Sequence, residues 1–74
     1  MSEIKITRKD IALGKRIKRM RNKAGLTQEQ LAEKVHVSTT HIGFVETGKR
    51  RVSLKTLQRV ANALGLKVKD LIPF

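Results

Sequence analysis

The sequence contains no cysteine, tryptophan or tyrosine, and it has only one proline and two phenylalanines. Without cysteine the chain can form neither a disulfide framework nor a cysteine-ligated zinc site. The two histidines, His36 and His41, have no cluster of carboxylates near them in sequence. We therefore expect no metal site and no cofactor. So few aromatic rings also argue against a stacking platform for single-stranded nucleic acid.

Long apolar runs and signal-peptide features are absent as well. No run approaches membrane-spanning length, and the first ten residues, MSEIKITRKD, have no apolar segment. We expect a cytoplasmic protein, associated with the nucleoid, that has no membrane partner. The sequence offers no nucleophile–base pair, no phosphate-cradling glycine loop and no set of metal ligands, so we expect no enzymatic activity.

Acidic residues are scarce, because 6 Asp and Glu stand against 17 Lys and Arg and leave a net charge of +11. That density of positive charge on 74 residues favours a polyanionic partner, most simply nucleic acid. A membrane-surface peptide fits less well, because the chain is divided into short capped segments instead of one long amphipathic helix. A chain of this length forms one domain with a small core.

The most informative stretch runs from Thr27 to Gly48 and reads TQEQLAEKVHVSTTHIGFVETG. Thr27 is a favourable N-cap, and Gln30 stands three residues later, which is the spacing of a capping box. His36 and Val37 then form a tight turn. The apolar residues before this turn share one helical face: Leu31, Ala32 and Val35. The stretch therefore begins with a short helix and a turn.

A second short helix begins after the N-cap candidate Ser38 and ends at Gly48, which completes a helix-turn-helix pattern. Advancing about 100° per residue places Ile42 and Val45 toward the core. The opposite face lacks the lysine, glutamate and glutamine of a solvated surface and holds Thr40, Phe44 and Thr47. This face indicates contact with a partner. The alternative is a plain solvent face with Phe44 packed against a neighbour.

We expect the chain to consist of a flexible arm over residues 1–9 and a domain over residues 10–74. Asp10 is the N-cap candidate of a helix that ends at Gly25. Its apolar stripe consists of Leu13, Ile17, Met20 and Ala24. Its other face is a run of cations without an intervening acid, Lys15, Arg16, Lys18, Arg19 and Lys23. A phosphate backbone would relieve their mutual repulsion, although a solvated face is the alternative.

The residue pattern in the last part of the chain predicts two more helices. A cationic loop, Lys49 to Arg51, leads to the N-cap Ser53 and a helix that ends at Gly65. Its stripe consists of Leu54, Leu57, Val60, Ala61 and Leu64. A final turn over residues 68–72 is halted by the only proline. The apolar residues Val68, Leu71, Ile72 and Phe74 either join two subunits or finish the core. The fold class is all-α, with five short helices.

These motifs resemble the phage repressor and Cro family, also called the xenobiotic-response-element family. The resemblance covers roughly residues 13–72 and includes LTQEQLA, the segment IGFVETGKR, and SLKTLQRVANAL. It implies a five-helix, lambda-repressor-like domain that binds operator DNA as a homodimer. The operator would be palindromic double-stranded DNA, and the helix over residues 38–47 would enter its major groove.

The same resemblance implies residue roles by position. Base contacts match Ser38, Thr39, Thr40 and Phe44. Phosphate contacts match Gln28, His41, Thr47, Lys49, Arg50 and Arg51, and Gln28 would also brace the recognition helix. Arg21 and Glu46 match a structural ion pair between the first and third helices.

Two positions depart from the family pattern. His36 stands in the turn where the family commonly has glycine, and a non-glycine residue with positive φ is unfavourable. Gly43 lies inside the recognition helix, where it costs up to about 1 kcal/mol relative to alanine. Either Gly43 lets the helix approach the DNA backbone closely, or it is a neutral or mildly destabilising substitution.

The sequence thus predicts a sequence-specific DNA-binding transcriptional regulator, acting as a repressor. The alternatives on the same fold are an antitoxin of a toxin–antitoxin pair and a coactivator-type module that binds protein. An antitoxin would be encoded beside a toxin, and a coactivator-type module would show little sequence preference on DNA.

Overall fold

The structure is a computed structural model that describes residues 5–74, and within that range it contains helices and loops but no strand. Five helices follow one another along the chain: α1 (Arg8–Lys23), α2 (Gln28–Val35), α3 (Thr39–Glu46), α4 (Leu54–Ala63) and α5 (Val68–Leu71). The five-helix, all-α prediction is confirmed for the described residues. None of these helices is both long and apolar enough to span a bilayer.

Local capping signals set most of the helix starts. The Thr27 hydroxyl accepts from the Gln30 backbone N–H at 3.0 Å, and the Gln30 side chain accepts from the Thr27 backbone N–H at 2.9 Å. This is the predicted capping box. Ser38 and Ser53 cap α3 and α4 in the predicted way.

The predicted start of α1 is wrong. Its N-cap is Thr7, and Asp10 is the reciprocal partner three residues into the helix. The Asp10 carboxylate accepts from the Thr7 backbone N–H at 2.8 Å, so a threonine–aspartate capping box takes precedence over an isolated aspartate cap. Residues 8 and 9 of the predicted arm are therefore the first residues of α1. Residues 1–4 of that arm lie outside the described residues.

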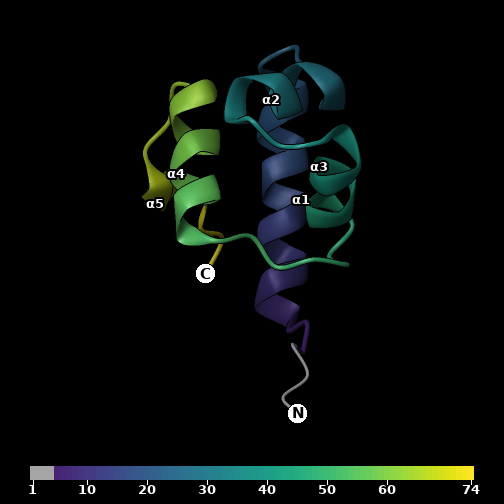
Figure 1. Cartoon of the computed structure of the whole chain (residues 1–74). Coiled ribbons are helices and arrows are strands. Elements are labelled where there is room, and N and C mark those ends of the chain that lie inside the picture. The colour runs from purple at the N-terminus through teal and green to yellow at the C-terminus, as the bar shows by residue number, and fades with distance from the viewer. Residues whose placement is uncertain (1–4) are drawn as a thin grey trace.

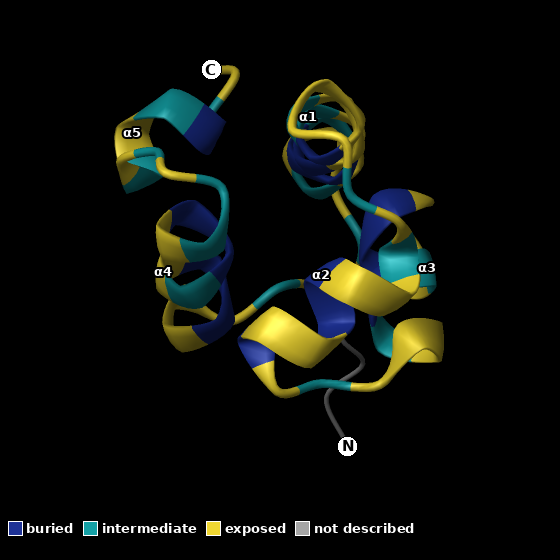
Figure 2. Ribbon diagram, turned by 90° about the horizontal axis from the view of Figure 1, so that it is seen from above, coloured by how far each residue is buried: buried dark blue, intermediate teal, exposed yellow. Residues whose placement is uncertain are grey.

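The five helices close around one apolar core, and α1 is one wall of it. Figure 1 shows α3 and α4 on opposite sides of α1, with α2 across one end and α5 beside α4. Helix α2 packs against both α3 and α4, while α1 packs against α3 and α5. Seen from above, the dark-blue buried faces of α2 and α4 turn toward the interior (Figure 2).

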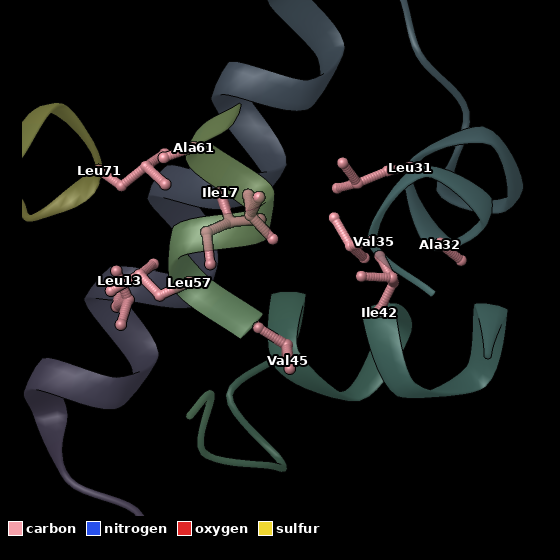
Figure 3. Close-up of a cluster of buried hydrophobic side chains, with 11 residues drawn as sticks. Leu13, Ile17, Leu31, Ala32, Val35, Ile42, Val45, Leu57, Ala61 and Leu71 are labelled. Carbon is pink, nitrogen blue, oxygen red and sulfur yellow. The ribbon is translucent and has the colours of Figure 1, made fainter. Parts of the chain in front are cut away.

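All five helices contribute to the core, and Figure 3 shows their side chains converging. Its buried apolar members are Leu13, Ile17, Leu31, Ala32, Val35, Ile42, Val45, Leu57, Val60, Ala61 and Leu71. Two predicted stripe residues are exceptions. Ala24 is the exposed C-cap of α1, and Leu54 is 66% exposed at the first position of α4. A stripe indicates which side of a helix a residue occupies, but it does not indicate how far a packing partner extends along that helix.

The end of the chain completes the core of this molecule. Leu71 is fully buried, and Val68 and Ile72 pack partly buried against the core. Phe74 remains exposed, with the Lys9 ammonium 5.2 Å from its ring centroid. Arg16 Nε donates to the Asp70 carbonyl at 3.1 Å, so this cation of α1 is directed toward α5.

Candidate nucleic-acid interface

The outward face of α3 is exposed, as the helical periodicity predicts. Ile42 and Val45 are buried in the core, whereas Phe44 retains 45% of its accessible surface. The exposed hydroxyl residues around it are Ser38, Thr39, Thr40 and Thr47. Phe44 therefore does not pack into the core of its own chain, and this face is available to a partner.

The turn before α3 has a backbone conformation that the sequence singled out. His36 has φ 60° and ψ 43°, which is the left-handed region. Its backbone N–H bonds to the Ala32 and Glu33 carbonyls and so closes α2. The strain of a β-carbon in this region is typically about 1–2 kcal/mol. The turn places the N-terminus of α3 directly after α2, with Ser38 as its cap.

A buried ion pair fixes α3 to α1. Arg21 Nε donates to Glu46 Oε2 at 2.6 Å and Arg21 Nη2 donates to Glu46 Oε1 at 3.0 Å. The side chains are only 8% and 0% exposed, so this predicted ion pair is present and is buried. Charge-assisted, two-point contacts of this kind specify geometry strongly.

The same ion pair also extends to α2. Gln28 Nε2 donates to Glu46 Oε1 at 3.0 Å, which is the predicted bracing of α3 by Gln28. Arg21 Nη1 donates to the Leu26 carbonyl at 2.7 Å and to the Asn22 side chain at 3.0 Å. Sequence reasoning missed the Leu26 and Asn22 contacts, because neither residue type signals a partner for arginine. The second N–H of the Gln28 amide has no hydrogen-bond partner among the described residues.

The loop after α3 is folded back onto that helix. The backbone N–H groups of Lys49 and Arg50 both donate to the Phe44 carbonyl, at 2.8 and 3.2 Å. Their cationic side chains are exposed. The Thr47 hydroxyl donates to the Gly43 carbonyl at 2.9 Å, so it must rotate before it can donate to a phosphate.

Arg51 is linked to the start of α1. Its Nε lies 3.5 Å from Asp10 Oδ2, and its side chain is 56% exposed. The pKa of Asp10 is lowered mainly by the backbone N–H of Thr7, and the Arg51 charge contributes. Asp10 is therefore an anionic neighbour of a predicted phosphate contact. Sequence reasoning missed this link, because it joins residues far apart in the chain.

His41 lies half-buried in the first turn of α3, and its backbone N–H donates to Ser38 Oγ at 3.0 Å. Burial lowers the pKa of its imidazole from the ordinary 6.5, and the charge of Arg50 lowers it further. At neutral pH the ring is therefore uncharged. A neutral imidazole still offers one N–H donor, and protonation would supply a second donor and a charge.

Most of the predicted contact residues surround one hollow beside α3. The hollow has a volume of about 370 Å³ and is lined by Gln28, Thr39, Thr40, Gly43, Phe44, Thr47 and Lys49. Lys49, Arg50 and Arg51 line a second hollow next to it together with Ile6. Ser38 and His41 belong to neither set. Among the described residues, no group of His, Asp and Glu could hold a metal ion.

Comparison with known proteins finds a matching family model and similar proteins. The family model described as "Helix-turn-helix" matches residues 17–71. The immunity repressor protein of Bacillus phage phi105 is 40% identical over 62 residues, which are 84% of this chain and 43% of the repressor. This chain thus spans less than half the length of that relative.

Solved structures show the same arrangement of helices. The restriction-modification controller protein C.AhdI from Aeromonas hydrophila is 34% identical, with a TM-score of 0.80, over 82% of this chain and 92% of that one. SinR, the master regulator for biofilm formation, was solved in complex with DNA. It is 30% identical with a TM-score of 0.75 over 80% of this chain and 95% of that one.

Proposed function

The chain belongs to the helix-turn-helix family of DNA-binding transcriptional regulators, and we propose that it is a repressor that binds a palindromic operator. Its recognition helix, α3, enters the major groove of double-stranded DNA. The role has no enzymatic step, and the protein acts in the cytoplasm on the nucleoid. The immunity repressor among its relatives supports repression over activation.

The observation that carries this proposal is the pairing of two surfaces. The outward face of α3 is exposed and uncharged, and a fixed loop of three cations, Lys49, Arg50 and Arg51, follows it directly. Uncharged groups suit the edges of bases, and cations suit phosphates. In this arrangement the loop holds the backbone while α3 faces the bases.

Each predicted residue has a physical role in this complex. The base contacts come from the hydroxyls of Ser38, Thr39 and Thr40 and from the ring of Phe44. Phosphates are held by the Lys49, Arg50 and Arg51 cations and by the second amide N–H of Gln28. The remaining phosphate contacts are His41 and Thr47. Glu46 and Arg21 stay inside the protein and keep α3 at a fixed angle to α1.

We propose that the protein acts as a homodimer. A helix of eight residues spans few base pairs, so one copy has little sequence information to read. Two copies related by a two-fold axis read two half-sites about 34 Å apart, and this symmetry is what makes an operator palindromic. A stable monomer on a single half-site would contradict this part of the proposal.

Selection of bound duplexes from a random DNA pool tests the proposal. We expect enrichment of a palindromic motif whose two half-sites lie about one helical turn apart. The double variant Thr40→Ala, Phe44→Ala should lose the enrichment, whereas Gln58→Ala on the exposed side of α4 should retain it. Failure of the wild-type protein to enrich any duplex would refute the proposed function.

A further inference from the structure

Gly43 lies in the interior of α3, where glycine is a poor helix former. The other four glycines have a reason within the protein itself. A β-carbon on Gly14 would overlap the carbonyl oxygen of Val45, and Gly25, Gly48 and Gly65 have positive φ. Gly43 has neither reason. Its backbone is helical, and a β-carbon there would meet only the amide of Gln28, at an ordinary 3.9 Å.

The surroundings of Gly43 indicate what the missing side chain leaves open. Gly43 lines the hollow beside α3, together with the exposed side chains of Phe44 and Lys49. The Gln28 amide stands at its edge and is held there by Glu46, so this wall of the hollow is fixed. A side chain at position 43 would project into the space between these groups.

The chemistry of the hollow is that of an anion site. None of its lining residues is acidic. The Lys49 ammonium supplies positive charge, and the second N–H of Gln28 and the hydroxyls of Thr39 and Thr40 supply donors. These groups complement the oxygens of a phosphodiester, which carries one negative charge and offers only acceptors.

We propose that Gly43 is a positioning residue whose bare backbone makes room for one phosphodiester group of the DNA backbone. The group sits in the hollow between Gln28 and Lys49, closer to α3 than any side chain at position 43 would allow. This seat sets how deeply α3 enters the groove, and so it sets which bases Thr40 and Phe44 can reach. The inference rests on the proposed function, since its ligand is the same DNA.

The test compares Gly43→Ala and Gly43→Leu with the wild-type protein on the selected operator. Both substitutions improve helix propensity, and a β-carbon at position 43 makes only an ordinary contact with the Gln28 amide, so Tm should rise by about 3–8 °C. DNA affinity should nevertheless fall, by about threefold for alanine and about 100-fold for leucine, as expected when a fitted contact is overpacked. Asn62→Leu, on the exposed side of α4, is the matched control for an added surface leucine and should bind normally.

Neutral methylphosphonates, introduced one at a time, identify the phosphate concerned. In the wild-type protein, one position in each half-site should weaken binding when neutralised. In Gly43→Leu that same change should have no further effect, because the phosphate is already displaced. Unchanged affinity of Gly43→Leu, or an affinity loss that leaves the sensitivity to every phosphate intact, would overturn the inference. If the wild type itself binds no duplex, the proposed function fails instead.

Discussion

At the scale of single residues, Phe44 leads to a prediction about which base pair α3 contacts. It is the one large apolar side chain exposed on α3, and it has no hydrogen bond to offer a base edge. The apolar feature of the major groove is the C5-methyl group of thymine. A half-site should therefore contain at least one T·A pair whose methyl group contacts Phe44.

Replacing that thymine with uracil removes only the methyl group and should weaken binding about fourfold, the equivalent of ~0.8 kcal/mol. Phe44→Ala should abolish the difference between the two duplexes. Because Phe44 is exposed, the variant should keep the wild-type Tm to within a few degrees. If instead Phe44→Ala loosens the dimer and the uracil scan is flat, Phe44 packs against the partner subunit.

His41 makes a prediction about pH. The pKa of His41 is lowered in the free protein, which means that the fold favours the neutral ring. The contribution of the neutral ring to the free energy of unfolding is therefore lost as pH falls below 6.5. A DNA phosphate favours the protonated ring, so binding should take up a proton. As pH is lowered from about 7.5 to about 5.5, the DNA affinity of the wild type should rise more steeply than the DNA affinity of His41→Asn. Parallel pH profiles would show that His41 does not meet a phosphate.

At the scale of helices, the orientation of α3 depends on Glu46. This carboxylate, fully buried, accepts from Arg21 on α1 and from Gln28 at the start of α2. Removing one partner leaves a buried charge without compensation, which typically costs about 3–5 kcal/mol. The contact of α3 with α1 and its contact with α2 would therefore loosen together.

Glu46→Ala should therefore lower Tm by more than about 10 °C in a domain of this size. Glu46→Gln keeps a carbonyl acceptor for the same donors and should give a smaller decrease. Thermal melting monitored by circular dichroism measures both variants, with Phe44→Ala as the surface control. A Glu46→Ala protein that melts like the wild type but no longer binds DNA would assign Glu46 to recognition.

At the scale of the whole molecule, the net charge of +11 predicts affinity that falls steeply with salt. Each phosphate neutralised contributes about −0.9 to the slope of log affinity against log salt concentration. Arg51→Ala should weaken binding to all sequences alike and flatten that slope by about one unit. Lys69→Ala, on α5, removes the same charge away from α3 and should leave the slope nearly unchanged. An unchanged slope in Arg51→Ala would exclude Arg51 as a phosphate contact.

The sequence by itself determined the features that depend on neighbours three or four residues away. The capping box of Thr27, the serine caps of α3 and α4, and the buried faces of α2 and α3 all follow from local hydrogen bonds and helical periodicity. The resemblance to a known family added the Arg21–Glu46 pair, which no local pattern could supply. Local rules also misplaced the start of α1, because Asp10 is the reciprocal partner of the Thr7 cap and not the cap itself.

Only the tertiary structure decided the features that depend on what lies opposite a residue. Leu54 has the periodicity of a core residue, but it is 66% exposed at the first position of α4. Gly14 and Gly43 both lie inside helices, yet a β-carbon would collide with the Val45 carbonyl at Gly14 and make only an ordinary contact with Gln28 at Gly43. Burial, close approach and the pairing of Arg51 with Asp10 are contacts between distant segments. Their energies therefore arise only when the helices are packed together.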